Sequence, residues 1–512
     1  MSEFKSILFQ NPENTPYKLD IAEPDYFKDL HLSQIVDEIA FLSKEYKVHS
    51  FFYTRPTLSD VLYRQEIMRD FENRELRSII SNFSEKMRSI NSHLKYIKTS
   101  DYPYEKSRWF MRAVEIYCEA VSTLEQELKT HPISSTGLTS FHSYISTFTR
   151  SNAFERLKNT SNQLAKDLAE VQYCVYIKQG TVTIKRYEGE ADFTPILTST
   201  FEKFSQKSPK SYLAKLSPQE NVNHIQKQIL DRVAILEPEL FDRLLQFHEA
   251  NQHHFMDDSI SLFHDEVQFY ISYLTYIDPL KQIGLSFCYP KISSSNKEIR
   301  GLAAYDLALA AQLHREKREV VSNDFHLKDP ERIFVISGPN QGGKTTFARM
   351  IGQLHHLSNL GCPVPGKESV LFYFDNLFSH FEREEDIETL RGKLQDDLVR
   401  IHQIMESSTS NSILIMNEIF SSTTLKDSTF LSKKILDAAS RLDLIAVFVT
   451  FIDELTSLNE KTVSMVAWVN PENPATRTYL LERKPANGLA YALALAEKYG
   501  LTQKRMEKRM HL

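Results

Sequence analysis

One stretch decides how the C-terminal part of this chain folds: Val335-Ile336-Ser337-Gly338-Pro339-Asn340-Gln341-Gly342-Gly343-Lys344-Thr345-Thr346-Phe347. It reads as the end of an apolar strand, a glycine-rich turn and the start of an amphipathic helix, and it contains the pattern Gly-x-x-x-x-Gly-Lys-Thr. In that context the N–H groups of the turn face an anion, and the helix N-terminus adds positive charge. The stretch therefore predicts a phosphate-binding loop. We expect Lys344 to reach the β- and γ-phosphates of a nucleotide and Thr345 to hold Mg²⁺.

The strand after this loop's helix completes the predicted site. The stretch 412–418 contains a short apolar run at 413–416, which is typical of a buried parallel strand, and Asn417 and Glu418 follow at its carboxyl end. Glu418 is expected to accept a proton from a water that attacks the γ-phosphate. Asn417 stands where a metal-binding Asp is usual, and it offers a neutral oxygen to Mg²⁺. The catalytic candidates are therefore Lys344 and Glu418, and the metal candidates are Thr345 and Asn417.

Further apolar runs predict the rest of an α/β sheet. A third strand is expected at 445–450, and two more at 463–469 and 478–481. Helical segments separate the first three strands, as parallel pairing requires. This alternation predicts a doubly wound or ABC-like sheet over residues 301–512. A serine-rich segment at 291–300 reads as the linker that leads into it.

Before residue 300 the spacing is mainly helical. Apolar residues recur at helical intervals between residues 30 and 98, again between 108 and 129, and again between 222 and 276. Such stripes predict long helices that pack a core. The fold class expected is therefore α/β plus mainly α: a helical region over 1–300 and an α/β domain over 301–512. His248, His253, His254 and His264 show no tight ligand spacing, so we expect solvated histidines there and no metal site.

Within the helical region the period changes to two near residues 171–195. Val175, Ile177, Val182 and Ile184 alternate with other residues and predict an inserted β-hairpin. The hairpin carries three basic residues, Lys178, Lys185 and Arg186. They are candidates for contact with a DNA backbone, or they simply lie on a solvated face of a hairpin that caps the helices.

Composition limits the possible classes of protein. The 512 residues allow roughly two to four domains. With 61 Lys+Arg and 67 Asp+Glu, the net charge is −6. Any DNA-binding surface must therefore be local, because clustered cations supply the affinity for phosphates. Four separated cysteines and the lack of a long apolar run predict a cytoplasmic protein with no disulfide framework and no membrane span.

Several motifs together are similar to the ATPase domain of the MutS family of DNA mismatch-repair proteins. They are Gly338-Pro339-Asn340-Gln341-Gly342-Gly343-Lys344-Thr345-Thr346-Phe347, Gly361-Cys362-Pro363-Val364-Pro365, Met416-Asn417-Glu418-Ile419, Thr423-Thr424 and Asp427. The resemblance is strong over 320–500 and weaker over 25–300, where 52–60 and the long helices look like the family's core and lever region. It implies an ABC-type ATPase domain that binds ATP and Mg²⁺, a homodimer with composite sites, and DNA as a partner. The hairpin near 171–195 would be a reduced form of the family's clamp.

The chain departs from the family's pattern at several places. The lever-like sequence starts within the first 30 residues, so we expect neither the mismatch-reading domain nor the connector domain. Asn417 replaces the usual Asp, and Phe451 replaces a His that senses the γ-phosphate, so we expect slow or partner-dependent turnover. In the segment 390–397 Gly392 persists but Leu394 replaces a Ser, which leaves Lys393 as a candidate for the contact with the other subunit's nucleotide. The segment 485–495 resembles the family's dimer-contact helix.

Three functions are compatible with these features. The leading hypothesis is a DNA-associated ATPase of mismatch-repair or recombination type, in which ATP closes a dimer and moves lever helices that grip DNA. The alternative is a nucleotide-gated scaffold with weak ATPase activity that binds a protein partner, such as a repair or recombination protein. A small-molecule kinase shares only the phosphate loop, and Glu418 argues against it because it is placed to activate water.

Overall fold

The computed structural model describes residues 4–11, 21–43, 46–178, 181–191, 195–196, 224–382, 392–469 and 477–486. Contacts divide the chain into two compact units. The helical unit comprises residues 1–4, 74–133 and 139–264, and the sheet unit comprises 5–73, 134–138 and 265–512. This division does not coincide with the domain boundary at residue 300, which stays a prediction.

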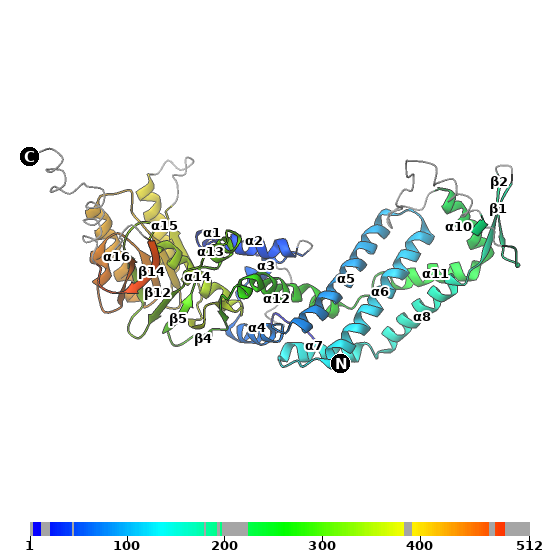
Figure 1. The fold of residues 1–512 in the computed structure, drawn as a ribbon, viewed down its shortest axis with the longest axis horizontal. Helices are drawn as coiled ribbons and strands as arrows, with labels where there is room; N and C mark the ends of the chain where they lie inside the picture. The colour runs from blue at the N-terminus through cyan, green and yellow to red at the C-terminus, as the bar shows by residue number, and fades with distance from the viewer. Residues whose placement is uncertain are drawn as a thin grey trace, which may run out of the picture. The chain divides into compact units, whose positions relative to one another are not determined.

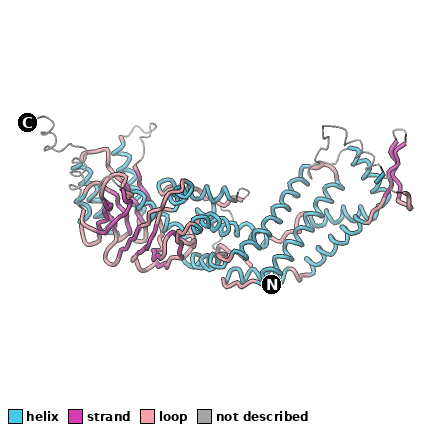
Figure 2. The backbone as a smooth tube through the Cα atoms, viewed as in Figure 1, coloured by secondary structure: helices cyan, strands magenta, loops and turns pink. Residues whose placement is uncertain are grey.

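The helical unit is built mainly from long helices (Figures 1 and 2). Its helices are α5 (Arg74–Thr99), α6 (Pro103–Thr130), α8 (Asn152–Ala169), α10 (His224–Leu236) and α11 (Pro238–Asn251), together with parts of α7 (Thr136–Phe148) and α12 (Asp258–Gln282). A proline opens α6 and α11, where a missing N–H costs nothing because the first turn has no partner for it. Trp109 of α6 packs on His93 and Tyr96 of α5, with ring centroids 5.0 and 5.3 Å apart. The predicted long helices are confirmed.

The predicted hairpin is also present in this unit. Strands β1 (Tyr173–Lys178) and β2 (Thr181–Arg186) pair antiparallel. Ile184 packs against the buried pair Val233 and Ala234 of α10. Arg186 donates a hydrogen bond of 2.6 Å to the Leu236 carbonyl and lies 3.1 Å from a Glu237 carboxylate oxygen. Arg186 is therefore engaged within its own unit. Lys178 and Lys185 are exposed, and the Lys185 Nζ lies 5.7 Å from the Tyr176 ring centroid.

Two histidines of the helical unit are packed rather than solvated. The ring of His248 stacks on Phe110 at 4.6 Å, and its Nδ1 lies 3.0 Å from the Ser107 hydroxyl. His264 is buried. The prediction of solvated histidines was wrong for both, because each sits on the apolar face of its helix. His253 and His254 are exposed, as expected.

The sheet unit contains three sheets and the helices that cover them. The N-terminal helices are α1 (Tyr26–Asp29), α2 (Leu32–Leu42), α3 (His49–Phe52) and α4 (Leu58–Asp70), and α13 (Leu307–Arg315) follows the later half of α12. The six-stranded sheet has the order β10-β11-β12-β7-β13-β14. Its strands are β10 (Leu377–Phe381), β11 (Ile413–Asn417), β12 (Ile445–Val449), β7 (Ile333–Ser337), β13 (Thr462–Val469) and β14 (Arg477–Arg483). All neighbours are parallel except β14, which is antiparallel to β13.

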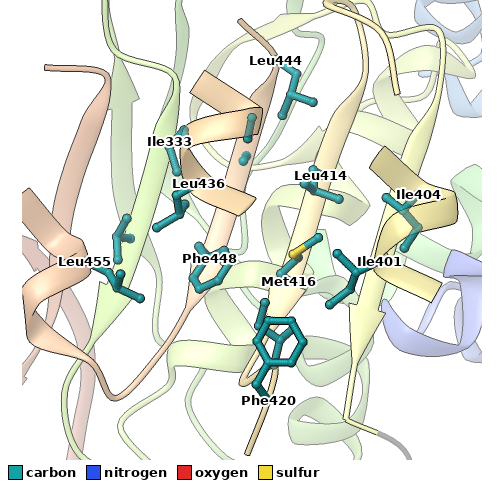
Figure 3. Packing of buried hydrophobic residues seen from close by; sticks show 14 residues of the cluster. Ile333, Ile401, Ile404, Leu414, Met416, Phe420, Leu436, Leu444, Phe448 and Leu455 are labelled. Atoms are coloured by element: carbon teal, nitrogen blue, oxygen red, sulfur yellow. The ribbon is translucent and has the colours of Figure 1, made fainter. Parts of the chain in front are cut away.

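The strands and helices of this sheet agree with the sequence prediction. Strands β7, β11 and β12 are buried throughout, because helices cover both faces of the sheet. On one face α15 (Lys393–Ser407) and α16 (Leu425–Leu442) pack on alternate strand residues, and Figure 3 shows Leu414, Met416 and Phe448 in that core. On the other face lies α14 (Lys344–Asn359), where Phe347 packs edge-on against Phe334.

The predicted linker at 291–300 was wrong. Strand β4 (Lys291–Ser293) pairs in parallel with β9 (Glu368–Phe372), and β5 (Ile299–Ala304) pairs antiparallel with β9. Together with β6 (Asn323–Leu327) they form a four-stranded sheet, and β3 (Phe287–Cys288) pairs with β8 (Val364–Pro365). The serine-rich residues lie at the end of β4 and in the turn that leads to β5. In that turn the Ser295 and Asn296 N–H groups donate to the Ser293 hydroxyl.

One buried amide fixes helix α14, which carries the predicted lysine and threonine. Gln353 is fully buried. Its amide nitrogen donates to the Leu30 carbonyl and to an Asp306 carboxylate oxygen, each at 2.9 Å, and its oxygen accepts from the Leu307 N–H at 2.8 Å. These bonds tie α14 to the turn at Leu30 and to the N-terminus of α13. The phosphate loop therefore has a rigid support, since a buried amide left unpaired would cost about 1–3 kcal/mol.

Candidate nucleotide-binding site

The glycine-rich stretch forms the turn between strand β7 and helix α14. The strand ends at Ser337 and the helix begins at Lys344. Gly338 has φ of +121°, and a Cβ there would lie 3.0 Å from the Ala467 Cβ on β13. Gly343, with φ of +91°, occupies the N-cap position of α14. Both positions require glycine because side chains rarely adopt this conformation. The six residues 338–343 thus form the predicted strand–loop–helix cradle.

Lys344 is folded back onto its own loop. Its side chain is 3% exposed, and Nζ donates a hydrogen bond of 2.8 Å to the Gly338 carbonyl. The same nitrogen lies 3.8 Å from a Glu418 carboxylate oxygen. Burial lowers the pKa of Lys344, and the charge of Glu418 acts in the opposite direction. The predicted lysine and carboxylate are therefore close together, and the lysine's ammonium is near the phosphate loop.

The two predicted metal-binding side chains touch. The Thr345 hydroxyl at the first turn of α14 donates to the Asn417 side-chain oxygen at the end of β11, at 2.9 Å. Helix α14 follows β7, and β7 is not a neighbour of β11, since β12 lies between them. Two neutral oxygens side by side are ligands of the kind that Mg²⁺ accepts, and they suit an ion that takes its other ligands from phosphates and water. This donor set fits the predicted metal.

Glu418 occupies a sharp turn directly after β11. Its φ is +53°, an unusual value for a residue with a side chain, and its N–H donates to the Val449 carbonyl of β12 at 2.9 Å. Burial raises the pKa of Glu418; Lys344 partly opposes this and the charge of Glu382 adds to it. A raised pKa makes a carboxylate a better proton acceptor, as a general base requires. The turn therefore aims a basic carboxylate at the loop.

The sequence did not predict the contact made by Phe451. This residue follows strand β12, and its half-exposed ring has its centroid 4.0 Å from the Lys344 Nζ. The sequence placed Phe451 after a strand, and the family resemblance aligned it with a His that senses the γ-phosphate, but neither predicted a contact with Lys344. The strand order brings it to the lysine, because β12 lies directly beside β7.

Other predicted residues lie around this centre or outside the described chain. Asn340 and Gln341 are exposed, Gly342 is buried, and Pro339 and Thr346 are partly exposed. Lys393 Nζ lies 2.5 Å from a Glu382 carboxylate oxygen, which also accepts from the Ser421 hydroxyl. Residues 390–391 and 487–495, including most of the predicted dimer-contact segment, fall outside the described residues. Residues 496–512 also fall outside the described residues.

Comparisons with known proteins agree with this site. The family described as MutS domain V matches residues 334–508, which contain the loop, Asn417, Glu418 and Phe451. This region of the chain is therefore similar to the MutS family. The predicted resemblance to that family is confirmed.

Curated MutS-family relatives match the same chain over a limited length. A DNA mismatch repair protein MutS of Rickettsia bellii (strain OSU 85-389) is 29% identical over 148 residues. Those of Rickettsia akari (strain Hartford) and Rickettsia rickettsii (strain Sheila Smith) are each 30% identical over 148 residues. In each case the match covers 29% of this chain and 17% of the relative. The described part of the chain contains no helix that is both long and apolar enough to cross a membrane.

Proposed function

We propose that this protein is an ATP-binding, DNA-associated ATPase of the mismatch-repair or recombination type. The observation that carries the proposal is the arrangement around Lys344. The lysine, the Thr345–Asn417 pair and Glu418 lie at one edge of a parallel sheet, beside a glycine-rich turn. This set contains a phosphate cradle, a place for a divalent cation and a base for water, which together are what ATP hydrolysis requires.

The mechanism begins with the loop and its lysine. Backbone N–H groups within 338–346, other than at Pro339, which has none, would hold the β- and γ-phosphates. Lys344 would exchange its bond to the Gly338 carbonyl for bonds to phosphate oxygens. That exchange is favourable because the ammonium binds an anionic phosphate oxygen more strongly than a neutral carbonyl oxygen. Thr345 and Asn417 would hold Mg²⁺, which when bound neutralises charge on the phosphates. The neutral Asn417 gives a weaker metal site than an Asp would.

Glu418 completes the reaction. Its carboxylate would accept a proton from the attacking water, and the new O–P bond forms as the bond to ADP breaks. The proton remains on Glu418 until solvent removes it. Among the described residues, the cation that faces this carboxylate is Lys344, which lies 3.8 Å away and bonds to a carbonyl instead. It therefore keeps lone pairs available for water.

The DNA and dimer parts of the proposal have different support. The three relatives described above are DNA mismatch repair proteins, and the helical unit offers long helices of the kind that could act as levers. On this account ATP closes a homodimer with two composite sites, and the helices move against DNA. The exposed Lys178 and Lys185 of the hairpin would contact the DNA backbone.

Competition binding with labelled DNA tests this part. Mismatched, junction and plain duplexes would compete at low salt, with and without ATP, for the wild type and for Lys344→Ala. We expect binding that weakens as salt rises and responds to ATP in the wild type only. A lack of DNA binding at low salt would remove the DNA half of the proposal. Nucleotide hydrolysis without any DNA response would instead favour a nucleotide-gated scaffold for a protein partner.

A further inference from the structure

The ammonium of Lys344 has an aromatic ring among its neighbours. Its Nζ donates to the Gly338 carbonyl at 2.8 Å, faces a Glu418 oxygen at 3.8 Å, and lies 4.0 Å from the Phe451 ring centroid. A cation at this distance from the face of a ring is attracted by the ring's negative face. Phe451 therefore helps to hold the lysine in its folded-back position.

The ring differs from its neighbours in exposure. Phe451 is 52% exposed, whereas Lys344 is 3% exposed. A half-exposed ring against a buried ammonium can swing out into solvent at little cost, because it leaves few packing contacts behind. The ring carries no group that donates or accepts a proton. Any effect of Phe451 on the reaction must therefore come from where it lies.

The ring lies where one end of the predicted nucleotide would bind. Strand β12 lies between β7, which leads to the loop, and β11, which leads to Glu418, so Phe451 follows the middle strand of the three. In the proposed function, Glu418 acts on the water that attacks the γ-phosphate. A side chain that contacts Lys344 beside Glu418 therefore stands at the γ-phosphate end of the cradle.

We propose that Phe451 is a positioning residue that lies at the γ-phosphate end of the site and that ATP, but not ADP, must displace. The inference rests on the proposed function. The ring holds Lys344 against Gly338, and a third phosphate can reach the lysine only when the ring moves away. ADP leaves that end of the site free, so the ring can remain on the lysine. Phe451 thus lowers the affinity for ATP relative to that for ADP.

Isothermal titration of the full-length chain with Mg²⁺ tests this inference. The ligands are ADP and the non-hydrolysable analogue adenosine 5′-(β,γ-imido)triphosphate. For Phe451→Ala we expect the triphosphate to bind about three- to thirtyfold more tightly, as expected from the loss of one cation–π contact, with ADP changed less than twofold. Phe451→Leu keeps bulk but has no ring face, so it should behave like Phe451→Ala. Thermal unfolding would check that both variants fold.

A second exposed phenylalanine supplies a matched control. The ring of Phe430 on α16 also faces a lysine, with the Lys434 Nζ 5.7 Å from its centroid, but it does not belong to the proposed site. Phe430→Ala should leave both affinities within twofold. The inference is overturned if Phe451→Ala changes neither affinity, or tightens ADP as much as the triphosphate. If Phe451→Leu matches the wild type, bulk alone acts and the holding role is wrong. A wild type that binds neither nucleotide would instead refute the proposed function itself.

Discussion

Two carboxylates lie at opposite ends of the six-stranded sheet. They share an unusual backbone conformation and a lysine neighbour, but their pKa values shift in opposite directions. Glu418 follows the carboxyl end of β11, and Asp443 lies just before the amino end of β12. Both adopt positive φ, +53° and +58°, and both face lysines. Their hydrogen bonds differ, however, and that difference separates a functional carboxylate from a structural one.

Asp443 is saturated with cations. Its carboxylate lies 2.6 Å from Lys461, 3.1 Å from Lys297 and 3.1 Å from Arg332. Burial acts to raise the pKa of Asp443, but the hydrogen bonds from the two lysines and the charge of Arg332 outweigh it and hold the pKa at about 2. Its lone pairs are thus used in contacts that stabilise the fold.

Glu418 shows the opposite balance. Its nearest cation, Lys344, is 3.8 Å away and donates to a backbone carbonyl. Burial therefore raises the pKa of Glu418, and Lys344 opposes this only in part. A carboxylate that the fold leaves incompletely bonded is a candidate for chemistry, whereas a saturated one contributes to stability.

The largest effect expected from this contrast is on turnover. Glu418→Gln removes the proposed base and should slow ATP hydrolysis by about 10²–10⁴-fold while nucleotide binding persists. Asp443→Asn, the matched change at the other end of the sheet, should leave turnover within twofold at a temperature where the protein is folded. Steady-state phosphate release would measure both. Equal slowing by the two changes would erase the distinction between the two carboxylates.

A change in the Thr345–Asn417 pair should have a smaller effect, and it should favour hydrolysis instead of slowing it. Asn417→Asp adds a negative charge beside Thr345, and a charged oxygen binds Mg²⁺ more tightly than an amide oxygen. We expect hydrolysis to reach half its maximum at about tenfold lower Mg²⁺ concentration. Titration of Mg²⁺ at saturating ATP would measure this shift, with Thr345→Ser as the control that keeps the hydroxyl. An unchanged Mg²⁺ requirement would mean that Asn417 does not face the metal.

The smallest effect is on stability. The folded pKa of Asp443 is below its unfolded value, so its contribution is present above about pH 4 and is lost as the pH falls toward 2. Asparagine tolerates the positive φ, so Asp443→Asn removes mainly the charge. We expect a loss of about 1 kcal/mol at neutral pH, after allowance for screening of this partly exposed group. Urea unfolding across pH should show the loss shrinking as the pH falls toward 2. A constant loss would show that the charge is not responsible.

The sequence predicted those parts of the sheet unit that depend on local pattern. The apolar runs predicted strands β7, β11 and β12, and the glycine-rich stretch predicted the loop between β7 and α14. The meeting of Thr345 with Asn417 also followed, because carboxyl ends of parallel strands share one edge of a sheet.

Contacts set by tertiary structure were not predicted. The Phe451–Lys344 contact depends on β12 lying beside β7, which no local pattern fixes. The partners of Asp443 come from three separate segments of the chain, so their spacing carries no signal. At 291–300 the sequence predicted a linker where strands β4 and β5 lie. The serine-rich turn between them is typical of a loop, and each strand contributes only a few residues to this segment.

Equilibrium binding of ATP in the presence of Mg²⁺ tests the central claim most directly. The account predicts that the wild type binds ATP and that Lys344→Ala weakens binding at least about tenfold, as expected for the loss of a charged hydrogen bond to phosphate. Lys461→Ala, which removes a lysine from the Asp443 end of the same sheet, should leave the affinity within twofold. Failure of the wild type to bind ATP, or equal affinity in the wild type and Lys344→Ala, would contradict the account.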